Sequence, residues 1–170
     1  KARRKAEIAF ADRHNQVAAA PSTGGNWTPP EPQRPAPGAT PGAEYDFPRG
    51  PARPDSFALL LGAGDYDNRD VPAVEFAHND VELMRQFLIK TLGYPAENIL
   101  VLKNPRQSEL RSFFGTKNNP RGRLHDIVNR EDIRHVYVYF SGHGLPSQDG
   151  LSGVLLPSDA DPQKADLTGY

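Results

Sequence analysis

The chemistry that this chain could perform centres on a histidine between two glycines, in the segment Ser141-Gly-His-Gly144. A histidine can act as a general base that deprotonates a nucleophile and then as a general acid that protonates a leaving amine. The flanking glycines let backbone and substrate approach the imidazole closely. Gly144 has no side chain, which leaves its N–H free to stabilise a developing oxyanion. We therefore interpret His143 as a candidate catalytic residue, against the alternative of a structural histidine that is satisfied by a backbone partner.

The usual thiol partner of such a histidine is absent, because the chain has no cysteine. Ser141 cannot easily replace it, since Ser141 and His143 lie on one strand end. Zero cysteines also exclude disulfides and say nothing firm about the compartment, so the localisation stays unknown.

Metal chemistry has weaker support. The spacings of His125, His135 and His143 fit no compact ligand pattern, so we assign no metal ligands. An acidic group, formed by Asp65, Asp67 and Asp70, could bind Ca²⁺ loosely. An ordinary solvated loop is the favoured interpretation of that group, and we expect no required cofactor.

Three strands and three helical segments would position His143. The apolar runs Ser56–Gly62, Asn98–Lys103 and Arg134–Phe140 are typical of buried strands in a parallel sheet. Helical spacing runs from Glu75 to Leu92, with Gly93 as its stop. Shorter helical patterns and a possible fourth strand follow, at Ser108–Phe114, Leu124–Val128 and Leu151–Leu156, before a polar end.

This alternation predicts an α/β fold, with a mostly parallel sheet and helices on its faces. Sites in such sheets lie just beyond the carboxyl ends of the strands, which is where His143 would be. The polar terminus at Gly169-Tyr170 has no closing element, so we expect a domain that is truncated at its C-terminal side.

Composition divides the chain into three parts. Residues 1–20 are rich in Ala, Lys, Arg and Glu and could form an N-terminal helix. Residues 21–55 are predicted to be a linker, because Pro21–Pro54 holds ten Pro and five Gly and cannot bury enough apolar side chain to offset the entropy of ordering. Residues 56–170 are predicted to be the globular domain.

Charge and hydropathy argue against two kinds of partner. The net charge is −1 and the pI is near 6.6, so no strong attraction to nucleic acid is implied. The sequence also has no run of about 18 apolar residues, so we expect no membrane span.

Four segments and one tyrosine resemble the caspase and metacaspase superfamily of cysteine peptidases. They are Tyr139-Phe-Ser-Gly-His-Gly144, Gly153-Val-Leu-Leu-Pro-Ser-Asp-Ala-Asp161, Leu59-Leu-Leu-Gly62, Phe76-Ala-His-Asn-Asp-Val-Glu-Leu-Met84 and Tyr66. The resemblance implies a caspase-like three-layer α/β/α sandwich and a polypeptide substrate.

The resemblance also implies roles for four residues. His143 matches the histidine of the Cys/His pair, and Gly144 matches the residue whose N–H contributes to the oxyanion hole. Ser141 and Asp80 match positions that line the pocket for a basic substrate side chain in metacaspases. A carboxylate can pair with a guanidinium in bidentate fashion, so cleavage after Arg or Lys is physically reasonable. The alternative for Asp80 is a charge that merely favours the helix macrodipole.

Two departures qualify this assignment. True caspases hold a substrate aspartate with an arginine just before the first helix, whereas this chain has Pro72-Ala-Val-Glu-Phe76 there. This difference points to the metacaspase-like, bacterial branch, in which some enzymes are activated by Ca²⁺.

The nucleophile of caspases lies about 50 residues beyond the histidine, and only 27 residues follow His143. The sequence thus predicts the large-subunit (p20-type) portion of a cysteine endopeptidase, which is inactive without a downstream Cys-bearing portion. A non-catalytic caspase-like module that binds a peptide or a partner is the alternative.

Overall fold

The computed structural model describes residues 46–130, 133–147 and 150–170. The chain divides into two units at Ala39–Thr40, and every described residue belongs to the second. The expected N-terminal helix over 1–20 lies outside the described residues, as does most of the expected linker. The last residues of that linker contact the domain: Phe47 packs edge-on against Phe87, with ring centroids 5.6 Å apart, and Gly50 N donates to Lys90 O.

A parallel sheet of three strands forms the centre of the fold. Its order is β2 (Ile99–Lys103), β1 (Ser56–Gly62), β3 (His135–Ser141). All the pairings are parallel, with Gly62 opposite both Lys103 and Ser141. The predicted strands are therefore present, and their carboxyl ends meet at one edge of the sheet.

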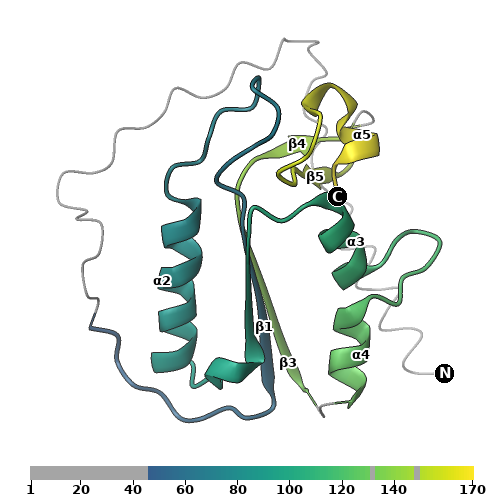
Figure 1. Ribbon diagram of the computed structural model, residues 1–170. Helices are drawn as coiled ribbons and strands as arrows, with labels where there is room; N and C mark the ends of the chain where they lie inside the picture. Colours follow the sequence, from purple (N-terminus) through teal and green to yellow (C-terminus); the bar gives the residue numbers. More distant parts are fainter. Residues whose placement is uncertain (1–45, 131–132, 148–149) are drawn as a thin grey trace. The chain divides into compact units, whose positions relative to one another are not determined.

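Helices cover both faces of this sheet (Figure 1). Helix α2 (Ala77–Lys90) lies on one face, while α3 (Gln107–Phe114) and α4 (Arg123–Arg130) lie on the other. Successive residues of a strand point to opposite faces, so Leu60 packs with the α2 side and Leu59 with the α3 side. The chain thus has the three-layer α/β arrangement, with a parallel sheet, that the sequence predicts.

The end of α2 follows the prediction at Gly93. Gly93 has φ +71°, a left-handed conformation that glycine adopts at no steric cost and that commonly ends helices. The helix itself is shorter than expected, since it begins at Ala77 and ends at Lys90.

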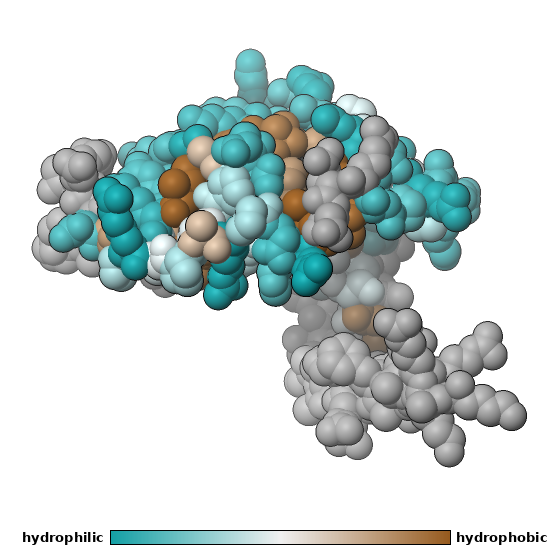
Figure 2. Space-filling view, turned by 90° about the horizontal axis from the view of Figure 1, so that it is seen from below, coloured by the Kyte–Doolittle hydropathy of each residue, from teal (hydrophilic) through white to brown (hydrophobic). Residues whose placement is uncertain are grey.

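Strand β3 corrects the expectation of a buried third strand. It pairs only with β1 and lies at the edge of the described sheet. Val136 and Val138 are 41% and 45% exposed. The β-branched pattern indicates that the side chains of this strand are suited to apolar contact. It does not indicate whether other residues of this chain cover them. Figure 2, seen from the end at which the strands begin, shows further apolar surface between polar side chains.

A second, smaller sheet lies beyond the carboxyl ends of the main strands (Figure 1). It consists of β4 (Gly144–Pro146) paired antiparallel with β5 (Gly153–Leu155). The possible fourth strand at Leu151–Leu156 is thus a short strand outside the main sheet, and β4 was not predicted. Three short helices complete the described chain: η1 (Ala96–Asn98), η2 (Pro162–Lys164) and α5 (Ala165–Thr168).

Candidate active site

His143 lies just after β3 and is held at two atoms. Its backbone N–H donates to the Tyr66 hydroxyl over 2.9 Å, and its Nε2 lies 2.8 Å from the carbonyl oxygen of Pro72. The Tyr66 and His143 rings are also in contact, with centroids 5.3 Å apart. Both partners come from the loop between β1 and α2, so this loop fixes the imidazole.

The contact with Pro72 determines the histidine tautomer. A carbonyl oxygen only accepts hydrogen bonds, so Nε2 must carry the proton. In the neutral imidazole, Nδ1 is then the nitrogen with a free lone pair. Nδ1 is therefore the atom that can take a proton from a nucleophile, while Pro72 orients the ring from the other side.

The two glycines around His143 differ in their surroundings. A Cβ on Gly142 would lie 2.8 Å from Phe140 Cζ and 2.9 Å from Ala63 Cβ, so packing explains this glycine. A Cβ on Gly144 would have one neighbour within 4 Å, Val154 O at 3.4 Å, which is ordinary contact. The space beside Gly144 is thus open within the described part of the chain.

The direction of the Gly144 N–H follows from the small sheet. Leu155 N donates to Tyr170 O over 2.7 Å, and Leu155 O accepts from Tyr170 N over 2.9 Å, so the backbone groups of Leu155 point away from β4. Gly144, which pairs with Leu155, therefore stands at a non-hydrogen-bonded position, where N–H groups point away from the partner strand. This geometry leaves the Gly144 N–H available to an external acceptor.

Asp80 and Ser141 meet on the α2 side of the sheet. The Ser141 hydroxyl donates to Asp80 Oδ2 over 2.8 Å, although 61 residues separate the two. Asp80 is half-buried in the first turn of α2, and among the described residues it forms no salt bridge. The pair therefore presents a carboxylate whose charge is not neutralised by a neighbouring cation in this part of the chain.

Tyr139 borders the same carboxylate. Burial raises the pKa of Tyr139, and the negative charge of Asp80 raises it further, against a lowering by its hydrogen bond with Ser141. Tyr139 and Ser141 are two residues apart on β3, so they face the same side of the sheet, and Tyr139 packs on the α2 side. Tyr139 thus lies on the side of the sheet at which Asp80 and Ser141 meet.

The acidic group proposed for Ca²⁺ already has protein partners. Asp65 Oδ2 accepts from Asn104 Nδ2 over 2.9 Å, and Asp67 Oδ2 pairs with Arg106 over 3.0 Å. In the described ranges, no three acidic, histidine or cysteine side chains gather so that they could hold a metal ion.

Ser141 is not hydrogen-bonded as a nucleophile activated by His143 would be, because its one hydroxyl proton is donated to Asp80 and not to His143.

Tyr66 and Pro72 are the contacts that sequence reasoning missed. Tyr66 is among the residues that carry the family resemblance, but no role was assigned to it. Both residues follow β1, whose carboxyl end lies beside that of β3. Because parallel strands end at one edge of the sheet, the loop after β1 could have been expected to lie near His143.

Tyrosine titration is expected to limit stability at high pH. Burial raises the pKa of Tyr66, and a hydrogen bond from the His143 backbone lowers it less; burial also raises the pKa of Tyr170. A folded-state pKa above the ordinary value of about 10 gives stability that is complete below pH about 10 and falls as the pH rises further.

Urea unfolding at a series of alkaline pH values tests this. The urea concentration at the unfolding midpoint should decrease as the pH rises above about 10. Tyr66→Phe should make this decrease with pH less steep. A midpoint that stays level through this range would contradict the prediction.

The layers and the site together define a caspase-like protein, with a histidine after a parallel strand and the Asp80–Ser141 pair at the end of the same strand. The sequence model of the metacaspase, peptidase C14 domain matches residues 58–165. The chain therefore belongs to the metacaspase family of cysteine peptidases. No helix among the described residues is long and apolar enough to cross a membrane.

One curated relative is Metacaspase-1 of Eremothecium gossypii. It is 28% identical over 110 residues, which are 60% of this chain and 24% of the relative. The chain thus spans about a quarter of the length of that relative. The relative is fungal, so the bacterial branch expected from the sequence stays a prediction.

Proposed function

We propose that this chain is the histidine-bearing, large-subunit (p20-type) portion of a metacaspase-like cysteine endopeptidase. The observation that carries the proposal is the hydrogen bond from His143 Nε2 to Pro72 O, which leaves Nδ1 as the acceptor. The nucleophilic cysteine is supplied by a downstream portion of the same enzyme. The chain alone, which has no cysteine, is inactive.

The geometry supports an acyl-transfer sequence. His143 Nδ1 takes the thiol proton, and the thiolate attacks the carbonyl carbon of the scissile peptide bond. The resulting oxyanion accepts from the Gly144 N–H. The imidazolium returns its proton to the amine as the C–N bond breaks, and a water molecule, deprotonated by Nδ1, then hydrolyses the thioester.

Asp80 and Ser141 support a preference for Arg or Lys before the cleaved bond. The half-buried Asp80 carboxylate has a hydroxyl donor on Oδ2, and a substrate guanidinium can supply further donors to it. Removal of a substrate cation from water is favourable only where it meets such a charge. A neutral or acidic side chain gains nothing comparable at this position.

Among the described residues β3 pairs on one side only, which supports a place for the Cys-bearing portion along its other edge. Edge strands present unsatisfied N–H and C=O groups to an incoming strand, and Val136 and Val138 offer it exposed apolar surface. A strand added at this edge would end beside Ser141 and His143, since β3 leads directly to them. A cysteine at the end of that strand would face the imidazole.

Fluorogenic peptides that end in Arg, Lys or Asp test the proposal. The chain alone and the same protein extended through its natural reading frame are compared, each with Ca²⁺ and with a chelator. Hydrolysis after Arg or Lys by the extended protein alone is the expected result, and the pair of conditions decides whether Ca²⁺ activates. If the folded protein hydrolyses no peptide in any condition, the result would instead favour a non-catalytic caspase-like binding module. A chain without cysteine is compatible with that function.

A further inference from the structure

Asn104 joins the end of β2 to the loop that carries both partners of His143. It follows β2 directly and has φ +51°, the one positive φ of a non-glycine residue in the described part of the chain. Asparagine adopts this left-handed conformation more readily than other non-glycine residues. The turn directs the side chain of Asn104 across the carboxyl end of the sheet toward the loop after β1.

The Asn104 side chain bonds this loop and α2 through both its oxygen and its nitrogen. Its Oδ1 accepts from Gly64 N at 2.9 Å, from Asp65 N at 3.0 Å and from His78 Nε2 at 2.9 Å. Its Nδ2 donates to Asp65 Oδ2 at 2.9 Å. His78 approaches closely because position 64 is glycine, where a Cβ would lie 3.1 Å from Nε2.

These bonds hold the base of a closed loop. Gly64 O accepts from Val74 N over 2.8 Å, so residues 64 and 74 meet where Asn104 bonds to Gly64 N. Between them lie Tyr66 and Pro72, the residues that hold the backbone and the imidazole of His143. A displacement at the base would therefore move both contacts of the histidine together.

A second connection leads from Asn104 to the other side of the loop. The Asn104 carbonyl accepts from Ser158 Oγ over 2.8 Å, and Ser158 O accepts from Asp67 N, also over 2.8 Å. Ser158 is 5% exposed, so these bonds are shielded from competing water. The loop is thus attached to β2 at Gly64, Asp65 and Asp67.

We propose that Asn104, assisted by His78, is a positioning residue for His143. Asn104 holds the loop base so that Tyr66 and Pro72 keep the imidazole in the Nε2–H tautomer and keep Nδ1 directed at the nucleophile. The inference rests on the proposed function for its catalytic meaning. It concerns a geometry that is measurable in this chain without any activity.

The primary test is Asn104→Gly, which accepts the positive φ and removes only the side chain. Asn98→Ala is the matched control, because Asn98 donates to Ser56 O over 3.1 Å at the opposite end of the sheet. Nitrogen-15 NMR of the neutral His143 imidazole reports the tautomer, and amide hydrogen exchange reports the N–H donated to Tyr66. We expect Asn104→Gly to raise the Nδ1–H population and speed the exchange, and Asn98→Ala to do neither.

His78 provides a second pair of variants if Asn104→Gly does not fold. Gln at position 78 retains an N–H donor for Asn104 Oδ1, whereas Ala removes it. His78→Ala should shift the His143 tautomer and His78→Gln should restore it in part. A His143 tautomer and amide exchange that stay at wild-type values in folded Asn104→Gly or His78→Ala would overturn the inference.

Kinetics of the extended protein then separate this inference from the proposed function. Displacement of the loop at residues 64 and 74 should lower kcat by about 10- to 10²-fold and leave KM nearly unchanged. A changed KM with an unchanged kcat would contradict the positioning role. If the wild-type extended protein were inactive, the proposed function would fail, while the NMR comparison would still decide whether Asn104 positions His143.

Discussion

His143→Ala in the extended protein is expected to lower kcat/KM for peptide hydrolysis by about 10²- to 10⁴-fold, the usual contribution of a general base. The variant removes the nitrogen that deprotonates the thiol and later protonates the leaving amine. Its hydrogen bond to Pro72 O also disappears, but the backbone bond from residue 143 to Tyr66 can persist. The fold should therefore be retained, which circular dichroism and urea unfolding can verify.

His125→Ala is the matched control for this variant. His125 is an exposed histidine of α4, whose side chain contacts Asp126 and Asn129. Its loss should leave hydrolysis within about twofold, as for most surface substitutions. Activity of His143→Ala that stayed close to wild type would remove His143 from the mechanism.

The second large effect is expected for Asp80→Asn. A hydrogen bond to a charged group contributes about 1.5–3 kcal/mol, so kcat/KM for substrates that end in Arg or Lys should fall by about 10- to 10²-fold. Asn keeps the size of the side chain and can still accept from Ser141, so the change is mainly one of charge. Substrates with a neutral residue at this position should change little, and the preference for basic residues should largely vanish.

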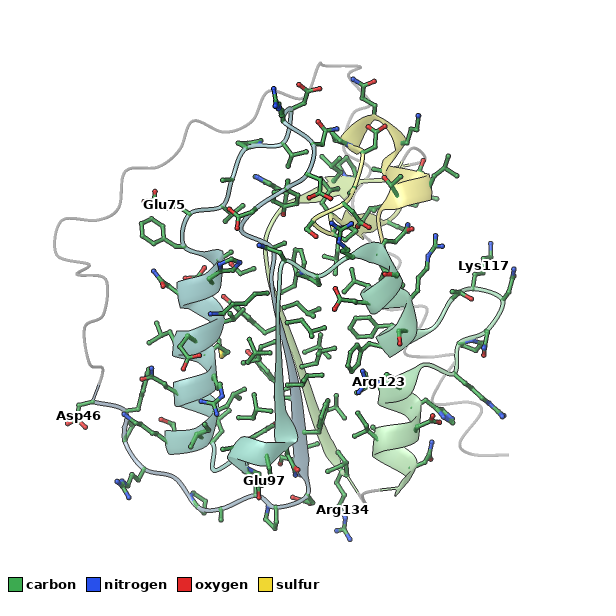
Figure 3. The ribbon with its side chains drawn as sticks, in the orientation of Figure 1. Asp46, Glu75, Glu97, Lys117, Arg123 and Arg134 are labelled. Carbon is green, nitrogen blue, oxygen red and sulfur yellow. The ribbon has the colours of Figure 1, made fainter. Side chains whose placement is uncertain are left out.

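Glu75→Gln controls for the loss of a negative charge at the same end of α2. Figure 3 shows Glu75 ahead of the helix, directed away from the sheet, and its side chain is exposed. We expect it to keep the wild-type preference. An Asp80→Asn enzyme that still favours Arg and Lys would mean that Asp80 only favours the helix macrodipole, the alternative that its position near the helix start leaves open.

Much of the fold is readable from the sequence because its central strand is buried on both faces. The apolar run over Ser56–Gly62 matches β1 residue for residue. The stop at Gly93 is readable because a positive φ suits glycine. The helix starts are less accurate, since helix ends depend on local hydrogen bonds that residue type alone does not reveal.

The edge position of β3 was not readable in the same way. Its alternation of aromatic and β-branched residues is equally suited to a central strand and to an edge strand that awaits a partner. Which one it is depends on the strand order β2–β1–β3, a long-range property. The short β4 has only three residues, too few for a periodic signal.

Candidate site residues could be named from the sequence, but their contacts could not. A histidine between glycines after a strand marks His143, but its partners Tyr66 and Pro72 lie 77 and 71 residues earlier. Parallel strands bring such distant loops to one edge, and the sequence does not say which backbone carbonyl will meet the imidazole. The pairing of Ser141 with Asp80 was implied only by family resemblance, and its short distance is a result of the fold.

The most direct test of the account is active-site labelling of the extended protein. A peptidyl acyloxymethyl ketone that ends in Arg, a thiol-directed probe, is incubated with the wild-type protein and with His143→Ala, and mass spectrometry locates the modified residue. A matched probe that ends in Asp is the specificity control. The account predicts labelling by the Arg probe at a cysteine beyond Tyr170, and little labelling of His143→Ala or by the Asp probe. No labelling of folded wild-type protein, or labelling that is unchanged in His143→Ala, would contradict a Cys/His peptidase built on this chain.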